Sequence, residues 1–107
     1  MARTLTIKRN KSFAGFLGKM LVYVADAAAN EPTIKGAACR KLGELKNGEE
    51  KSFSIDTAAT TVYVIGSEST KDFCVDSMAI PEGTADVRLT GKVTLDPQNG
   101  NPFVFDK

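Results

Sequence analysis

The chain has 107 residues, of which 42% are hydrophobic and 25% are charged, and its formal net charge is +1. This composition predicts one folded domain over residues 1–107, and the near-neutral charge excludes the strong basic field of a dedicated nucleic-acid or membrane-surface binder. The sequence contains no histidine, which excludes serine-histidine and cysteine-histidine catalysis and removes the commonest zinc ligand. We therefore expect no enzyme activity, no metal, no cofactor, no nucleic-acid partner and, since no apolar run approaches about 20 residues, no membrane insertion.

The first two predicted strands differ in their patterning. Residues 4–9 alternate, with Leu5 and Ile7 on one face and polar side chains on the other, which is typical of a half-buried strand. Residues 21–25 are continuously apolar and rich in β-formers, which predicts a central strand buried on both faces. An apolar link that contains glycine, residues 13–18, joins the two.

A tight turn is predicted at Asn47-Gly48. A two-residue type I′ loop would place Leu45 on the face of the neighbouring strand's serines. A three-residue loop, residues 46–48 with Gly48 left-handed, instead collects four side chains on one face: Cys39, Leu45, Phe53 and Ile55. We prefer the second register because it gathers more apolar side chains on one side of the hairpin. It predicts a β-hairpin with Cys39 in the core.

Three further strands are predicted over residues 60–65, 73–78 and 103–105, and the clearest of all over residues 85–95. In that strand Gly91 occupies an apolar position, which we interpret as a bend or bulge over the core. Several short strands separated by glycine, proline and asparagine turns predict an all-β fold. We interpret it as an immunoglobulin-like antiparallel β-sandwich.

The two cysteines, Cys39 and Cys74, allow at most one disulfide. The basic start of the chain and the apolar run that follows have the form of a signal peptide, but Lys19 interrupts the run. We therefore expect a cytoplasmic protein with free thiols, with association with the cell envelope as the alternative. Arg40 and Lys41, which follow Cys39, would lower the pKa of that thiol and make it a candidate nucleophile. The alternative, which we favour, is a buried core cysteine.

Two connections are the predicted interaction surface, because binding residues concentrate on loops held by a rigid scaffold. They are residues 13–18, an apolar patch, and residues 26–35, a long loop. The candidate contact residues are Phe13, Phe16, Leu17, Asn30 and Glu31. An exposed edge strand is a second route, because pairing with a second copy would give a homodimer.

Three segments occur in an order that resembles small bacterial β-sandwich domains of the PEGA or carboxypeptidase-regulatory-like type. They are residues 21–24 (Leu-Val-Tyr-Val), 42–55 (Leu-Gly-Glu-Leu-Lys-Asn-Gly-Glu-Glu-Lys-Ser-Phe-Ser-Ile) and 61–65 (Thr-Val-Tyr-Val-Ile). The resemblance spans residues 4–66 and implies an immunoglobulin-like sandwich without catalysis, often an accessory or cell-envelope module. The chain departs from it at residues 56–60, which lack the glycine usual at that corner, and in the longer segment between Val24 and Leu42.

These observations predict a non-catalytic binding or protein-interaction module that acts through a protein partner or self-association. One alternative is a carbohydrate-binding sandwich that stacks sugars on Tyr23, Tyr63 or a phenylalanine. A second is a thiol-dependent enzyme that uses Cys39. Seven basic residues near the first strands form either a nucleic-acid patch or a polar face balanced by acidic residues, and the near-neutral charge favours the polar face. They are Arg3, Lys8, Arg9, Lys11, Lys19, Arg40 and Lys41.

Overall fold

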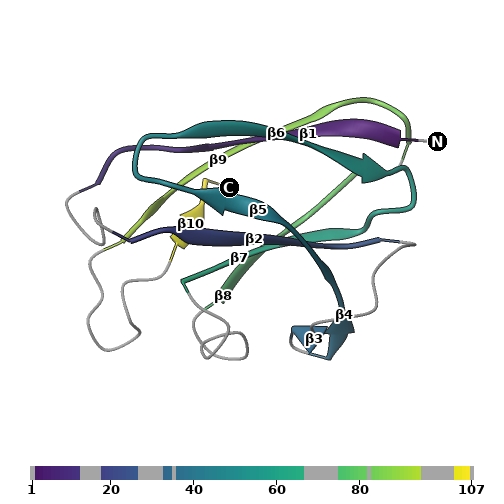
Figure 1. Cartoon of the computed structure of the whole chain (residues 1–107). Helices are drawn as coiled ribbons and strands as arrows, with labels where there is room; N and C mark the ends of the chain where they lie inside the picture. Colours follow the sequence, from purple (N-terminus) through teal and green to yellow (C-terminus); the bar gives the residue numbers. More distant parts are fainter. Residues whose placement is uncertain are drawn as a thin grey trace.

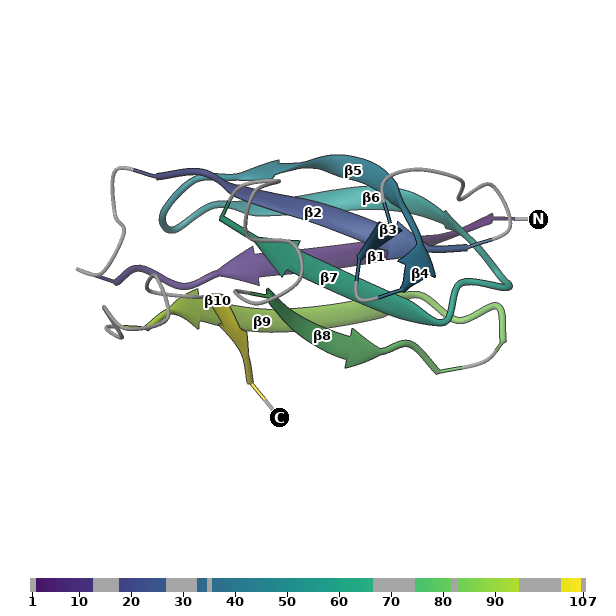
Figure 2. The ribbon, with the colours of Figure 1, turned by 90° about the horizontal axis from the view of Figure 1, so that it is seen from below.

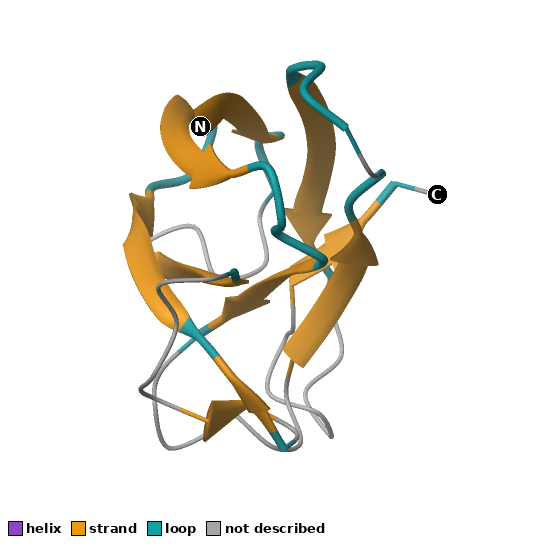
Figure 3. Ribbon diagram, turned by 90° about the vertical axis from the view of Figure 1, so that its right-hand side faces the viewer, coloured by secondary structure: helices purple, strands orange, loops and turns teal. Residues whose placement is uncertain are grey.

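The computed structural model describes residues 2–12, 18–26, 33–34, 36–66, 75–81, 83–94 and 103–106. All regular structure in these ranges is β. The strands are β1 Ala2–Arg9, β2 Met20–Ala25, β3 Thr33–Ile34, β4 Ala37–Ala38, β5 Arg40–Leu45, β6 Glu50–Asp56, β7 Thr61–Ile65, β8 Val75–Ala79, β9 Val87–Val93 and β10 Phe103–Phe105. Eight of them form two four-stranded sheets that face each other (Figures 1 and 3), so the predicted all-β sandwich is confirmed.

The two sheets have the strand orders β10-β9-β1-β6 (sheet A) and β5-β2-β7-β8 (sheet B). Neighbouring strands run antiparallel except for β1 and β9, which are parallel, so the expectation of a wholly antiparallel sandwich is wrong at that pair. A parallel pair needs a long connection, and β1 and β9 meet that condition because they come from opposite ends of the chain. No helix in the described ranges has the length and apolar character that a membrane crossing requires.

The main core lies between the sheets, where the predicted alternation places Leu5 and Ile7 of β1, both fully buried. The continuously apolar β2 is central in sheet B and buried on both faces, as predicted. Its Val22 and Val24 face the main core. Its Tyr23 points the other way into a smaller outer cluster beneath the β3–β4 hairpin, whose members are Tyr23, Ile34, Cys39, Tyr63 and Ile65.

The turn after Leu45 has the predicted conformation at Gly48, whose φ is +79°. A backbone hydrogen bond from Glu49 to Lys46 closes it at 3.0 Å. The predicted hairpin is nevertheless wrong, because β5 pairs with β2 in sheet B and β6 pairs with β1 in sheet A. The turn therefore connects the two sheets. Leu45 and Ile55 both belong to the main core, but they come from different sheets instead of lying side by side in one.

Cys39 is fully buried, as predicted, but not on the predicted face. The register between β2 and β5 shifts after Val22, so that Leu42 is an extra residue on β5. A bulge of one residue reverses the alternation beyond it. Leu42 packs against the main core, and Cys39 lies in the outer cluster, away from Leu45 and Ile55.

Gly91 does not mark a bulge, because β9 pairs with β1 and β10 without a register shift. It marks a close approach instead. A Cβ at Gly91 would lie 2.6 Å from Cζ of Phe103 and 2.6 Å from the carbonyl oxygen of Val104. The Phe103 ring thus covers the glycine, and it meets Phe105 edge to face with centroids 5.1 Å apart. The missing side chain leaves room for the aromatic ring that seals β9.

Candidate binding pocket at one end of the sandwich

All five residues predicted to form an interaction surface lie outside the described residues. They are Phe13, Phe16, Leu17, Asn30 and Glu31. Cys74 also lies outside them, so its pairing with Cys39 stays a prediction.

The two alternative functions depend on Cys39 and on the tyrosines Tyr23 and Tyr63. All three residues lie in the described part of the chain and are buried. Burial raises the pKa of the Cys39 thiol, and its Sγ donates a hydrogen bond to the carbonyl of Ala37 at 3.4 Å. An activated nucleophile needs the opposite, an accessible thiol with a lowered pKa. Tyr23 and Tyr63 are 0% and 9% exposed, so neither provides a flat ring for a sugar. In the described ranges, Val104 is the exposed large apolar residue, and no aromatic ring is exposed.

The predicted basic group divides between surface and core. Lys8, Lys11 and Lys19 are exposed, whereas Arg3 and Arg9 are 4% and 0% exposed. Both arginines point inward because they have the same parity on β1 as Leu5 and Ile7, which face the core. Their side chains reach the two opposite ends of the sandwich, where the backbone carbonyls of the turns are found. They are therefore not part of a nucleic-acid surface.

Arg9 closes one end, which we call the closed end and define by Arg9, Gly18, Leu45 and Gly91. Its Nη1 donates to the carbonyls of Gly18 at 2.8 Å and Leu45 at 2.7 Å. Both distances are those of good hydrogen bonds to a charged donor. Burial lowers the pKa of Arg9 from its ordinary value of 12.5. The guanidinium therefore satisfies two carbonyls that the fold would otherwise leave without a donor.

Arg3 lies at the other end, the open end, which we define by Arg3, residues 57–60, Ile80 and Ala85. Figure 2 shows the N-terminus, the β6–β7 turn and the β8–β9 connection together at this end. Nη2 of Arg3 lies 3.5 Å from the carbonyl oxygen of Ala59, and Nη1 lies 3.4 Å from that of Ala85. Both distances exceed the usual range. The Nε atoms of Arg3 and Arg9 are both buried, so the two ends differ in the distances from Nη to the carbonyls and not in the burial of Nε.

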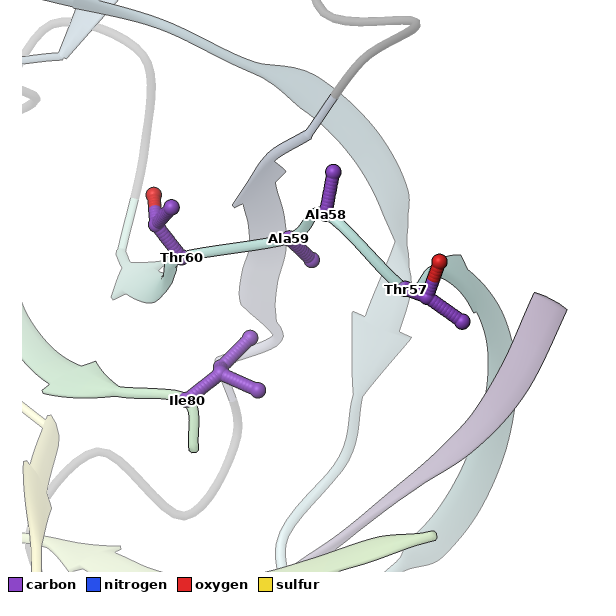
Figure 4. A pocket seen from close by; sticks show the side chains of 5 residues that line it. All are labelled: Thr57, Ala58, Ala59, Thr60 and Ile80. Carbon is purple, nitrogen blue, oxygen red and sulfur yellow. The ribbon is translucent and has the colours of Figure 1, made fainter. Parts of the chain in front are cut away.

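An open pocket with a volume of about 670 Å³ lies at this end (Figure 4). Its lining residues are Thr57, Ala58, Ala59, Thr60 and Ile80. The side chains of Ala59 and Ile80 are buried, and Figure 4 shows them facing each other from the turn and from the residue after β8. Ala58 and Thr60 are exposed at the rim. Ala59 therefore belongs to the pocket wall and, through its carbonyl, to the surroundings of Arg3.

The pocket wall is held by backbone hydrogen bonds. Ala58 donates to Oδ1 of Asp56 at 2.8 Å, and Ala59 donates to the Asp56 carbonyl at 3.0 Å. Thr60 donates to Ala25 at 3.0 Å, and Ile80 donates to Thr60 at 2.9 Å. These four N–H groups are already used, whereas the hydroxyl groups of Thr57 and Thr60 belong to residues that line the pocket. The fold therefore holds the pocket wall in place, and the carboxylate of Asp56 is part of that support.

A third arginine, Arg40, has a carboxylate partner for its guanidinium. Nε of Arg40 donates to both carboxylate oxygens of Asp26, at 3.1 and 2.9 Å, and its Nη2 lies 2.7 Å from Oδ2. The Asp26 side chain is fully buried. The same Nη2 also donates to the Ser54 carbonyl at 3.1 Å, which ties β5 to β6 across the two sheets. Arg40 has a bidentate carboxylate, and no carboxylate lies within ion-pair distance of Arg3 among the described residues.

Sequence reasoning missed the burial of Arg3 and the pocket, although one signal was present. The alternation that places Leu5 and Ile7 inside also places Arg3 and Arg9 inside, because all four residues share one parity. An arginine at each end of an inward-facing run indicates a charge buried at each end of a sandwich. The pocket itself had no sequence signal, because residues 57–60 pattern only as a turn. No protein-family model matches the chain, and no curated protein matches it at a significant level.

Proposed function

We propose that the chain is a non-catalytic binding module that takes its ligand at the open end of the sandwich. The observation that carries the proposal is the pocket of about 670 Å³, whose wall is held in place by backbone hydrogen bonds of residues 58–60 and Ile80. Its volume falls in the range of pockets that bind small ligands or a few residues of a peptide. Loops at one end of a rigid sandwich are also where such folds carry their binding residues.

The finer predictions about the fold remain proposals. A constant-type immunoglobulin sandwich pairs its first and second strands in one sheet, whereas here β1 and β2 lie in different sheets. A PEGA or carboxypeptidase-regulatory-like origin fits the proposed role, since such domains serve as accessory modules without catalysis. The two-sheet fold and the arch from β5 to β6 are compatible with it.

Self-association through an edge strand is the weaker form of the proposal. The edge strands β5 and β6 carry exposed charged residues, among them Lys41 and Lys51. Charges on an edge oppose pairing with another chain. The β10 and β8 edges are connected, because Phe105 donates its backbone N–H to Oδ2 of Asp76 at 2.8 Å. We therefore favour a ligand at the open end over a second copy on an edge.

The proposal is tested by backbone-amide NMR with short peptides blocked at both ends, one apolar, one acidic and one basic. We expect at least one peptide to shift the amide signals of residues 57–60 and Ile80. The shifts should disappear in Ala58→Trp, which fills the pocket from an exposed position. Val104→Trp, which adds the same ring at an exposed site on β10, is the matched control and should leave the shifts unchanged. Shifts confined to other surfaces, or none with any peptide, would contradict the proposal.

A further inference from the structure

We propose that the ligand of the open-end pocket is an extended peptide, and that it adds an antiparallel strand to the free edge of β8 at Ser77 and Ala79. The inference rests on the proposed function and names the chemical class of the ligand. It starts from the four edge strands of the two sheets, which are β10 and β6 in sheet A and β5 and β8 in sheet B.

Three of the four edges carry features that oppose the addition of a strand. β10 has only three residues, and β5 contains the bulge at Leu42. β6 exposes Glu50 and Lys51, and its Ser54 carbonyl already accepts Nη2 of Arg40. Short strands, bulges and exposed charges are the devices by which proteins protect sheet edges. These three edges are therefore poor acceptors for another chain.

β8 is five residues long and pairs with β7 without a register shift. Its Ser77 and Ala79 are small, uncharged and exposed. The carboxylate of Asp76 is already used, because it accepts the backbone N–H of Phe105 at 2.8 Å. In the described part of the chain no strand follows β8 in sheet B, and Figure 2 shows it along one side of the sandwich. The edge beyond Asp76 is therefore open to another strand.

The backbone groups that face the free edge follow from the pairing with β7. Ile80 donates its backbone N–H to the carbonyl of Thr60 at 2.9 Å, so this N–H points toward β7. Hydrogen-bonding directions alternate along a strand. The backbone groups of Met78 therefore also point toward β7, and those of Ser77 and Ala79 point away from it. These two residues present two N–H donors and two carbonyl acceptors, which is the pattern that an added strand pairs with.

The side chains beside the edge define the pattern that the peptide should have. Met78 is half-buried and packs against the main core, whereas Ser77 is opposite Tyr63 on the outer face of sheet B. In an antiparallel pair, residues directly opposite each other place their side chains on the same face. An apolar residue of the peptide opposite Met78 would therefore cover it, and polar residues are accommodated opposite Ser77 and Ala79.

The pocket lies at one end of this edge. Ile80, one of its lining residues, directly follows β8. Because neighbouring strands lie about 4.8 Å apart, a peptide that continues one residue beyond Ala79 passes beside the backbone of Ile80. The side chain at that position has the same inward direction as the one opposite Met78. We therefore expect apolar peptide residues at both positions.

The probe is the blocked peptide acetyl-valyl-threonyl-valyl-threonyl-amide. In the proposed register its valines lie opposite Ile80 and Met78, and its threonines lie opposite Ala79 and Ser77. Two derivatives test this register. N-methylation of both threonines removes the N–H groups that face β8, whereas N-methylation of both valines removes N–H groups that point away from it. Binding is followed by the backbone-amide signals of Ser77 and Ala79.

We expect the parent peptide to shift both amide signals downfield and to slow their hydrogen exchange, because both N–H groups gain an acceptor. The threonine-methylated peptide loses two hydrogen bonds and should bind roughly tenfold more weakly or worse. The valine-methylated peptide should bind about as tightly as the parent. These comparisons use the native protein, so they do not depend on how any variant folds.

Two proline variants test the same edge from the protein side. Ser77→Pro removes an edge N–H and leaves the pairing with β7 intact, since proline is tolerated where the N–H of an edge strand faces away from the sheet. It should weaken binding of the parent peptide at least threefold. Ser52→Pro is the matched control on β6. Arg9 donates to the Glu49 carbonyl, so by alternation the N–H of Ser52 also faces a free edge. This control should bind the peptide as the native protein does.

Equal binding of the two methylated peptides, weaker binding of the valine-methylated one, or native affinity in a folded Ser77→Pro would overturn the added strand. If the parent peptide shifts the signals of residues 57–60 and Ile80 but not those of Ser77 and Ala79, the binding-module proposal stands and only the strand falls. If neither set shifts with this peptide or with the other blocked peptides, both proposals fail. Signals of Ser77 and Ala79 that change with protein concentration, without peptide, would place a second copy of the chain on the edge and overturn the assignment to a peptide.

Discussion

The two ends of β1 carry the same residue type on the same face of the same strand, yet the ends are built differently. At the closed end Arg9 donates to two carbonyls at 2.7 and 2.8 Å. At the open end Arg3 has only contacts of 3.4 and 3.5 Å. The two arginines are therefore similarly buried but differ in their distances to the nearest backbone carbonyls.

The surroundings of Arg9 and Arg3 also differ in their backbone hydrogen bonds and in the size of the neighbouring side chains. At the closed end Arg9 donates its backbone N–H to Glu49 at 2.9 Å, and Asn10 donates to Gly91 at 2.7 Å. Ser12 donates to Oδ1 of Asn47 at 3.0 Å, which ties the segment after β1 to the turn between the sheets. The open end is lined by small side chains that leave space instead. One end is sealed by packing and hydrogen bonds, and the other keeps a preformed hollow.

The largest expected effect separates the two arginines by stability. Arg9→Met leaves the carbonyls of Gly18 and Leu45 without a donor, and we expect a loss of about 3 kcal/mol in the free energy of unfolding. Arg3→Met removes a buried charge with poor compensation, and we expect a change between zero and a gain of about 1 kcal/mol. Urea denaturation of both variants measures the difference. Equal losses in the two would show that Arg3 is as structural as Arg9.

The next prediction compares packing at the two ends. Gly91→Ala places a methyl group 2.6 Å from the Phe103 ring and from a backbone oxygen, so we expect a loss of about 1–3 kcal/mol. Ala58→Val adds two methyl groups at the exposed rim of the pocket, and we expect a change within about 0.5 kcal/mol. Thermal denaturation measures both. A loss in Ala58→Val similar to that in Gly91→Ala would show that the open end is as tightly packed as the closed end.

A smaller effect is a loss of stability at high pH, which limits the pH range in which the two arginine variants can be compared. Burial raises the pKa of Cys39 and Tyr63 above their ordinary values of 9.0 and 10.0. The protonated forms are favoured in the folded state, so their stabilising contribution is complete below about pH 9 and is lost as the pH rises further. We expect stability to be flat from pH 7 to 8.5 and then to fall by up to about 1.4 kcal/mol per pH unit for each group.

The variant Cys39→Ala tests the cysteine contribution. Its stability should fall less steeply between pH 9 and 10 than that of the native protein, whatever the loss at neutral pH. Urea denaturation at pH 7, 9 and 10 gives the two slopes. An identical slope in the variant would mean that the Cys39 thiol is not kept neutral by burial.

The smallest effect concerns the turn at the closed end. Glu49 accepts the backbone N–H of Lys46 at 3.0 Å, and this bond, followed by the charges of nearby lysines, lowers the pKa of its carboxyl group. Because the folded state favours the charged form, its contribution is present at neutral pH and is lost as the pH falls through the lowered pKa. Glu49→Gln should therefore show slightly lower stability than the native protein at pH 7 and a smaller difference at pH 3. A difference that grows on acidification would have the wrong sign.

Structural features that depend on neighbouring residues could be predicted from the sequence, whereas features that depend on distant pairing partners could not. The alternation in β1 and the continuous apolar run of β2 predicted both strands and their buried faces, because strand periodicity depends on neighbouring residues. The strands that pair with β5 and β6 lie far from them in the sequence. The turn at Gly48 was therefore predicted correctly, but the hairpin around it was not. The bulge at Leu42, a single extra residue, moved Cys39 to the opposite face. The pocket depended on loops that only the assembled sheets bring together.

The most direct test of the open end as a binding site is the set of backbone-amide NMR signals from the two ends of the sandwich. We predict that titration with the blocked peptide that binds best shifts the signals of Ala59 and Ile80, which line the pocket, while those of Leu45 and Gly91 at the closed end stay in place. Equal shifts at the two ends, or no shift of Ala59 and Ile80 with any peptide, would contradict the role assigned to the open end.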